Sequence, residues 1–384
     1  MDRKDLILKH DNDDLPIEVR NAIAEETTRV SKLFDQSDTR HVLIIGGAGY
    51  IGGALTSGLL ERGMRVRSLD RLTYNHGAAI SGFLLDQNYS FVRGDMGNKA
   101  DMEAALDGIT DVVILAGLVG DPITKKFPDE AHDINDLALK DCIDQLNGRG
   151  LNKVIFVSTC SNYGLIEEDV LADENFELSP LSLYAKSKVR AEKYLLSIKG
   201  NTDYHPTILR FATAYGLAPR MRFDLTVNEF TREVADGNEL VVYDAHTWRP
   251  YCHVRDFARL IGRVLEFPVG LVSYEVFNVG GDENNHTKQS VVDLIMERLP
   301  NANVTYKANS SDPRNYRVSF EKVRRVMHFE PAYSIADGID EILWAMRTGL
   351  MNDVEARPNF YGNYALPGLE KKSAASPRVL EQVL

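Results

Sequence analysis

The chain is short of cysteine, of basic residues and of long apolar runs. Its three cysteines, Cys142, Cys160 and Cys252, form neither a metal-type cluster nor a disulfide pattern, so we expect no metal site and a reducing, cytoplasmic environment. The excess of Asp and Glu gives a net charge of −12, which argues against nucleic acid or an anionic membrane as the main partner. No apolar stretch approaches the ~20 residues that cross a bilayer, and the charged N-terminus does not resemble a secretion signal.

What the sequence does contain is a nucleotide-binding pattern between residues 41 and 71. An apolar run over 41–45 predicts a buried strand, and it leads directly into Gly46, Gly49 and Gly52. A helical stretch over 54–60 follows, and then a second strand over 64–69 that ends at Asp70. Glycines at this spacing let the backbone approach a diphosphate, whose charge lies at the N-terminus of the following helix.

Asp70 indicates which dinucleotide would bind. A carboxylate at the end of the second strand accepts hydrogen bonds from a ribose diol and repels a 2′-phosphate, which favours NAD over NADP. Arg71, next to it, weakens this preference. The alternative, a glycine-rich turn without a ligand, is disfavoured because the glycines lie between a strand and a helix with the acid at the expected distance.

Strands and helices alternate beyond Asp70. Strands are predicted over 89–93, 111–116, 153–159 and 206–212, and helices over 99–106, 129–147 and 181–198. This alternation predicts an α/β fold with a Rossmann-type, doubly wound parallel sheet, whose ligands gather at the carboxyl ends of the strands.

The pattern also suggests how the chain is divided. We expect an N-terminal extension over 1–40, an NAD-binding domain over 41–213 to which 253–281 returns, a smaller α/β substrate-binding domain over 214–350, and a tail over 351–384. A helix is predicted over 16–34, as a surface extension or, alternatively, a subunit contact. The tail from 352 is rich in Pro, Gly and Asn, which predicts poor order.

Tyr184 and Lys188 are the candidate catalytic pair. They lie one helical turn apart and project from the same face of the predicted helix. A neighbouring ammonium lowers the pKa of a phenol, so Tyr184 could act as a general base toward a sugar hydroxyl. Thr159 ends the preceding strand, where its hydroxyl could bridge the substrate oxygen and the phenol. The alternative is that the two residues are an ordinary solvent-facing turn of a helix. Their position after a strand of the nucleotide-binding sheet favours the catalytic interpretation.

In combination these motifs resemble the extended short-chain dehydrogenase/reductase superfamily, and within it the NAD-dependent nucleotide-sugar epimerase/dehydratase group, in particular members like UDP-galactose 4-epimerase. The resemblance covers about residues 41–345. It rests on GGAGYIG (46–52), Asp70, GDM (94–96), LAGLVGD (115–121), STCSNYG (158–164), YAKSK (184–188), LRFATAYG (209–216), RPYCHVRD (249–256), FNVGG (277–281) and DPRNYRVS (312–319).

The resemblance implies a catalytic triad of Thr159, Tyr184 and Lys188, and it implies that Asn135 supports the lysine. The implied cofactor contacts are Gly46, Gly49, Tyr50, Ile51, Gly52, Asp70, Arg71, Asp95, Met96, Leu115, Ala116, Gly117, Tyr184, Lys188, Phe211 and Thr213. The implied substrate contacts are Val119, Thr159, Cys160, Ser161, Asn228, Arg249 and Arg314. Arginine suits this role because its planar fork binds phosphate oxygens bidentately.

One departure from the group narrows the reaction. The 4,6-dehydratases carry Asp-Glu directly after the catalytic threonine, whereas this chain has Cys160 and Ser161. Neither residue suits the elimination, which disfavours dehydration. An acid–base role for Cys160 is a minor alternative, because buried thiols are usually inert. His253 is expected to be a structural, hydrogen-bonded residue.

The resemblance therefore implies an NAD-dependent epimerase that oxidises the C4 hydroxyl of a nucleotide-diphosphate sugar to a 4-keto intermediate and returns hydride to the other face. The alternatives are a nucleotide-sugar 4-dehydrogenase or 4-ketoreductase with net redox change, and a non-catalytic NAD-binding protein. Family members are commonly dimers, so we expect a homodimer.

Overall fold

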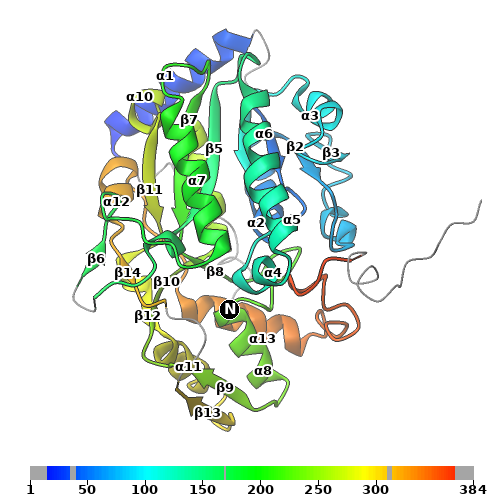
Figure 1. Cartoon of the computed structure of the whole chain (residues 1–384), viewed down its shortest axis with the longest axis vertical. Helices are drawn as coiled ribbons and strands as arrows, with labels where there is room; N and C mark the ends of the chain where they lie inside the picture. The colour runs from blue at the N-terminus through cyan, green and yellow to red at the C-terminus, as the bar shows by residue number, and fades with distance from the viewer. Residues whose placement is uncertain (1–14, 35–39, 168–169, 309–313, 368–384) are drawn as a thin grey trace, which may run out of the picture.

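The computed structural model describes residues 15–34, 40–167, 170–308 and 314–367 and is built around one parallel sheet (Figure 1). The seven strands lie in the order β11-β7-β5-β4-β1-β2-β3, and every neighbouring pair is parallel. They are β1 (His41–Ile45), β2 (Arg65–Asp70), β3 (Tyr89–Arg93), β4 (Asp111–Ile114), β5 (Lys153–Thr159), β7 (His205–Phe211) and β11 (Glu275–Val279). The predicted Rossmann-type sheet is confirmed.

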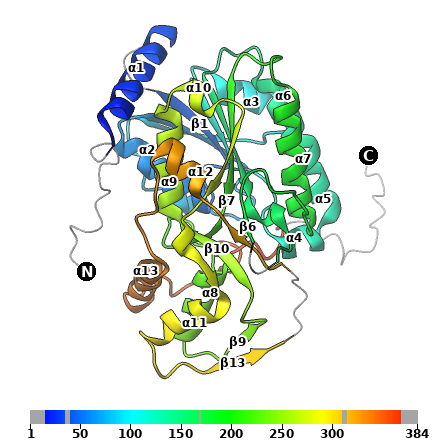
Figure 2. The same ribbon diagram turned by 90° about the vertical axis from the view of Figure 1, so that its left-hand side faces the viewer.

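Side chains of β1 alternate between two apolar layers, which is why this strand is apolar throughout. Val42 and Ile44 pack in one layer with α2 (Tyr50–Glu61) and α9 (Val254–Glu266). Leu43 and Ile45 pack in the other, with α3 (Lys99–Leu106), α6 (Leu139–Leu146) and α7 (Leu183–Ser197). Figures 1 and 2 show these two groups of helices on opposite faces of the sheet. A parallel strand covered on both faces needs apolar residues at every position.

The strand order reverses between β1 and β4, and this places the ligand-binding edge. From β1 the chain moves outward through β2 to β3, then crosses back to β4 on the other side of β1. The segments that leave β1 and β4 therefore diverge, and a crevice opens between them at the carboxyl end of the sheet.

The predicted helix over 129–147 is present but not uniform. It consists of α5 (Pro128–His132), a π-helical turn over Asp133–Ala138, and α6. A π-helical turn inserts an extra residue into the helix, and such turns recur at functional sites. No periodicity of the sequence indicated this insertion, because the buried positions Ala131, Asn135, Leu139 and Cys142 keep a spacing of three or four residues.

Three further helices, α8 (Thr226–Ala235), α11 (Lys288–Met296) and α13 (Ile335–Arg347), form with neighbouring strands a smaller part below the sheet (Figure 1). This part has its own core around Val227, Val291 and Ile339. Three small sheets contribute, ordered β12-β10-β8, β13-β9 and β14-β6. The strands are β6 (Leu171–Ala172), β8 (Thr213–Tyr215), β9 (Leu240–Tyr243), β10 (Trp248–His253), β12 (Asn285–Thr287), β13 (Val304–Lys307) and β14 (Arg317–Val318). Helices α10 (Val269–Val272) and α12 (Glu321–Met327) instead contact β11 of the central sheet, and α4 (Asp121–Lys126) contacts α7.

Helix α1 (Ile17–Phe34) is part of the main core, so its interpretation as a surface extension is wrong. Ile23 is buried in the layer that contains α2 and α9. Glu26 is also buried, with Oε1 lying 3.5 Å from Nζ of Lys153 at the start of β5. Helix α1 therefore covers the amino end of the sheet, opposite the ligand-binding edge. Residues 1–14 and 35–39 of the predicted extension lie outside the described residues.

The tail is ordered as far as it is described, contrary to the expectation for residues from 352. Val354, Phe360, Tyr361 and Leu366 are buried. The backbone N–H of Phe223 donates a hydrogen bond to the carbonyl of Tyr361, which ties the tail to the loop before α8. Residues 368–384 lie outside the described part.

The packing of α1 can be tested by truncating one buried side chain. We expect Ile23→Ala to lower the free energy of unfolding by about 2–4 kcal/mol, because it leaves a cavity in the main core. Ile17→Ala is the matched control, since Ile17 of the same helix is 57% exposed and its truncation should change stability by less than about 0.5 kcal/mol. Urea denaturation followed by circular dichroism measures both. Equal effects of the two substitutions would contradict the buried position of α1.

Candidate active site

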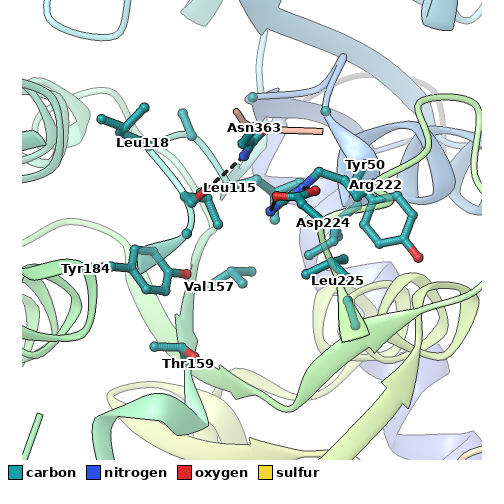
Figure 3. A pocket seen from close by; sticks show the side chains of 18 of the residues that line it. Tyr50, Leu115, Leu118, Val157, Thr159, Tyr184, Arg222, Asp224, Leu225 and Asn363 are labelled. Carbon is teal, nitrogen blue, oxygen red and sulfur yellow. Dashed lines mark hydrogen bonds and ion pairs between the residues drawn. The ribbon is translucent and has the colours of Figure 1, made fainter. Parts of the chain in front are cut away.

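A cleft of about 1020 Å³ lies at the carboxyl ends of the central strands. Its walls come from the segments after β1, β2, β4 and β5, from α7, from the loop before α8, and from the tail (Figure 3). It brings together most of the predicted cofactor and substrate residues, which are spread over more than 260 positions of the sequence, from Gly46 to Arg314.

The glycine-rich turn forms the floor of this cleft. Gly46 has φ of +90°, and a Cβ there would lie 2.8 Å from the backbone nitrogen of Ala116. A Cβ on Gly52 would lie 2.5 Å from the Gly46 carbonyl oxygen. Gly49 precedes α2, and Gly46, Gly49, Tyr50, Ile51 and Gly52 all line the cleft. Side chains are thus excluded where the helix N-terminus faces the cleft, which fits a dinucleotide diphosphate.

Asp70 is held at the end of β2 by donors from the chain itself. Its carboxylate accepts hydrogen bonds from the backbone nitrogens of Ala48 (3.2 Å) and Leu72 (2.8 Å), and Nε2 of His76 lies 3.5 Å away. Burial opposes ionisation of Asp70, but these contacts outweigh it and lower the pKa of the carboxyl group. A fixed carboxylate therefore faces the place where a ribose diol would lie.

Arg71 is directed toward a second carboxylate rather than toward the ribose position. Its Nη1 lies 3.2 Å from Oδ2 of Asp95, and both side chains are partly exposed. Asp95 and Met96, after β3, line the same end of the cleft. The guanidinium of Arg71 is therefore engaged with Asp95, whereas a guanidinium without this partner could have attracted the 2′-phosphate of NADP.

The segment after β4 forms the facing wall, to which Leu115, Ala116, Gly117 and Val119 contribute, with Phe211 and Thr213 opposite. Asn135, in the π-helical turn, accepts from Leu118 N (2.7 Å) and donates to Leu118 O (2.9 Å). Asn135 was predicted to support Lys188, but the hydrogen bonds of its amide go to the backbone after β4. Its role in this structure is to fix that wall.

Thr159, Tyr184 and Lys188 line one side of the cleft. Tyr184 projects from α7 with its oxygen toward the cleft, and Thr159 lies at the strand end near it (Figure 3). Lys188 Nζ donates a hydrogen bond to Val157 O (2.8 Å) and lies 5.9 Å from the centre of the Tyr184 ring. Oγ1 of Thr159 accepts from Ser161 N (3.1 Å), which leaves its own proton available for a ligand.

Burial is the largest influence on the pKa values of Tyr184 and Lys188. Burial lowers the pKa of Lys188 to about 8, only partly opposed by Glu192. Burial also raises the pKa of Tyr184 well above its usual range, as does Asp121, while Arg222 and Arg314 act in the opposite direction. The expectation of a lowered phenol pKa is therefore not met by the protein groups alone, because desolvation outweighs the nearby cations.

Two predicted substrate residues lie outside the cleft lining. Cys160 is fully buried, and its thiol donates to the Arg210 carbonyl (3.2 Å), so it neither contacts a ligand in this cleft nor acts as an acid or base there. Asn228 is also fully buried, and its amide joins Gly216, Tyr50 and Arg222. Both residues hold the walls rather than line them.

The remaining predicted substrate residues, Val119, Ser161, Arg249 and Arg314, line the cleft. Arg314 Nη1 lies 2.7 Å from Oδ2 of Asp121 and 3.3 Å from Oγ of Ser161. Residues 312–313 of the corresponding motif lie outside the described residues. His253 is structural as expected: it is fully buried, and its Nε2 lies 3.0 Å from Oε2 of Glu341.

No sequence motif pointed to several further lining residues. They come from the loop before α8 and from the tail: Arg220, Arg222, Asp224, Asn363, Tyr364, Leu366 and Pro367. These residues lie in segments without periodicity, so only tertiary structure brings them to the cleft. The one sequence feature that could have indicated them is the pair Arg220 and Arg222, two positions apart in the loop before α8.

Comparison with known proteins agrees with this geometry. Residues 42–280 match the model of the NAD dependent epimerase/dehydratase family. The chain belongs to this family. The family depends on NAD and its members are enzymes, so this chain is an NAD-dependent enzyme.

Among curated relatives of the epimerase/dehydratase family, an uncharacterised UDP-glucose epimerase, YtcB of Bacillus subtilis, is 27% identical over 78% of this chain and 95% of its own length. A dTDP-glucose 4,6-dehydratase of Streptomyces niveus is 26% identical over 78% of this chain and 90% of its own length.

Solved structures share the fold. UDP-glucose 4-epimerase of Thermus thermophilus, in complex with NAD, has a TM-score of 0.68 at 24% identity and covers 80% of this chain and 99% of its own. MoeE5, in complex with UDP-glucuronic acid and NAD, has a TM-score of 0.70 at 25% identity over 80% and 99%. None of the helices in residues 15–34, 40–167, 170–308 and 314–367 is long and apolar enough to cross a membrane.

The buried ammonium of Lys188 predicts a pH-dependent stability. Its pKa falls on folding from 10.5 to about 8, so the unfolded chain binds more protons between these pH values and stability rises with pH. Relative to Lys188→Met, we expect the wild-type free energy of unfolding to gain up to about 3 kcal/mol over this interval. Lys186→Met, on the exposed side of α7, is the control and should not change the pH profile. Parallel profiles for wild type and Lys188→Met in denaturant titrations would contradict the prediction.

Proposed function

We propose that this protein is a nucleotide-sugar 4-epimerase that interconverts two C4 epimers of a nucleotide-diphosphate hexose or related sugar with bound NAD. The observation that carries the proposal is that Thr159, Tyr184 and Lys188 line the same cleft as the glycine-rich turn, without a carboxylate at the two positions after Thr159. Bound NAD would supply a hydride acceptor and donor, and the positive charge of its oxidised form would favour ionisation of Tyr184.

The chain's own residues would handle the proton. Tyr184 takes the proton of the C4 hydroxyl and later returns it to the 4-keto sugar. Lys188 is charged below a pH of about 8, so around neutral pH it favours the phenolate of Tyr184. Thr159 donates to the same sugar oxygen, because the lone-pair side of its hydroxyl is already engaged by Ser161 N.

The residues after Thr159 support epimerisation over elimination. A dehydratase needs an acid for the departing hydroxide and a base for the C5 proton. In this chain the thiol of Cys160 is buried away from the cleft, and the hydroxyl of Ser161 is 3.2 Å from that of Tyr316. Burial raises the pKa of the Cys160 thiol far above its usual range, so it would not exchange protons near neutral pH.

Cations at the other end of the cleft support a diphosphate-containing substrate. Arg249 is held by the carbonyl oxygen of Trp248 (2.7 Å) and its guanidinium lies 5.3 Å from the centre of the Tyr316 ring. Arg314 and Lys288 line the same region. Relatives of this chain include enzymes named for UDP- and dTDP-sugars, so both nucleotide classes belong in the test.

The reaction can be tested without added cofactor. Purified full-length protein, incubated separately with UDP-galactose, UDP-glucuronic acid and dTDP-glucose, should convert at least one of them to its C4 epimer, as measured by NMR. The mass of the sugar nucleotide should not change. Accumulation of a ketosugar together with bound NADH would instead support the 4-dehydrogenase, and loss of water would support a dehydratase.

The role of Tyr184 has its own test. Tyr184→Phe should lower kcat by about 10²–10⁴-fold, because it removes the proton-transfer group while leaving the ring in place. Tyr243→Phe, at an exposed position of β9, is the matched control and should leave kcat unchanged. The Tyr184→Phe protein should still contain NAD after denaturation and mass spectrometry. Normal turnover of that variant would overturn the assignment of the base.

A further inference from the structure

The segment over 359–367, here called the C-terminal strap, crosses the NAD cleft. Nδ2 of Asn363 donates a hydrogen bond to the carbonyl of Val119 (2.9 Å), and Figure 3 shows this side chain reaching the wall after β4. Leu366 packs in an apolar cluster with Leu118, Ile123 and Ala131. The strap lies beyond residue 280, where the match to the family model ends.

The strap also holds Arg220, which is only 4% exposed. Nη2 of Arg220 donates to the carbonyls of Asn359 (3.3 Å) and Gly362 (3.2 Å) and to Oδ1 of Asn363 (2.8 Å). Its guanidinium lies 4.6 Å from the centre of the Tyr74 ring. All three acceptors are neutral groups, so the strap orients the guanidinium without neutralising it.

Arg220 is a buried cation without a counter-ion. Within the described part of the chain, no carboxylate lies within ion-pair distance of it, whereas Arg222, nearby, pairs with Asp224 at 2.5 Å. Nε of Arg220 is buried and has no hydrogen-bond partner. Burial and the charge of Arg222 lower its pKa to about 10, against the more distant attraction of Asp224 and Asp70, so it stays protonated at neutral pH. A buried charge is costly unless it is paired, which points to an anionic ligand in the cleft.

The neighbours of Arg220 indicate which anionic group of a ligand would pair with it. Pro219 packs against the first turn of α2, where a Cβ on Gly53 would lie 3.3 Å from its ring. Tyr50, in the same turn, donates to the carbonyl of Gly216 (2.6 Å). Tyr74 follows β2 and Asp70. Arg220 thus lies between the diphosphate-binding helix and the adenosine side, whereas Arg249 projects from β10 at the sugar-nucleotide end.

We propose that Arg220 is a phosphate-binding residue of the cofactor site, which pairs with the diphosphate of the bound dinucleotide, and that the C-terminal strap holds it there and retains the dinucleotide. The proposal rests on NAD binding and not on the epimerase reaction. It adds to the cofactor site a charged residue from the loop before α8 and a covering segment from the end of the described chain.

The test measures dinucleotide release from the full-length protein. The protein is loaded with NADH, mixed with a large excess of NAD, and followed by the loss of protein-bound NADH fluorescence. Arg220→Met should release NADH about 10- to 100-fold faster, the range expected for loss of one charge-assisted contact. Arg220→Lys should lie between this variant and wild type, because it keeps the charge but loses the fork. Asn363→Ala should also speed release, since it unties the strap from Val119.

Arg357→Met is the matched control. Arg357 lies in the same stretch of chain, pairs with Asp353 at 3.0 Å and contacts the ring of Phe360, but it does not line the NAD cleft. Its substitution should leave the release rate unchanged. Binding of UDP, measured by calorimetry, should be the same in wild type and Arg220→Met.

If Arg220→Met and Asn363→Ala both released NADH at the wild-type rate, the proposal would be overturned. It would also be overturned if Arg357→Met accelerated NADH release as much as Arg220→Met does. A loss of UDP binding in Arg220→Met with unchanged NADH release would place Arg220 in the sugar-nucleotide site and would also overturn it. If Arg220→Met does not fold, Arg220→Lys and Asn363→Ala carry the test. None of these measurements involves sugar turnover, so they stay informative whatever reaction the enzyme catalyses.

Discussion

The close approach of two backbones at the centre of the sheet determines the rest of the site. Where β1 ends, Gly46 lies so near the backbone of Ala116, after β4, that a Cβ would come within 2.8 Å of it. Only glycine fits there, and only glycine adopts its φ of +90° without strain. This contact sets the floor of the cleft, aims the N-terminus of α2 into it, and directs the segment after β4 along its wall.

The walls are held by polar groups that do not themselves face the ligand. Asn135 bonds both backbone groups of Leu118, and it does so from a π-helical turn that shifts it relative to a regular helix. Asn228 joins the loop before α8 to Tyr50. Buried amides suit this purpose because they satisfy donors and acceptors of the irregular backbone that would otherwise be left unpaired. The shape of the cleft therefore depends on residues that do not line it.

The cleft also contains buried cations, and burying a charge costs free energy of desolvation. Lys188 and Arg220 are both buried, and burial lowers the pKa of each. Neither lies in an ion pair with a carboxylate in the part of the chain that is described. Active sites commonly retain such unfavourable groups, because the bound ligand supplies the missing partner and the fold offsets the cost elsewhere. Helix α1, packed over the amino end of the sheet, adds apolar core far from the cleft.

The sequence by itself determined the parallel sheet, the glycine-rich turn, Asp70 and the pairing of Tyr184 with Lys188, because each depends on local spacing along one strand or helix. The end of the neighbouring strand also placed Thr159 near this pair, and the resemblance to a known family added the predicted catalytic roles and the arginines predicted to bind the sugar nucleotide. Only the tertiary structure decided that Cys160 and Asn228 are buried in the walls, that α1 belongs to the core, and that a Pro- and Gly-rich tail returns over the cleft to hold Arg220. These features depend on contacts between segments far apart in the chain, made by loops without periodicity, and no local pattern encodes which distant surface such a loop will meet.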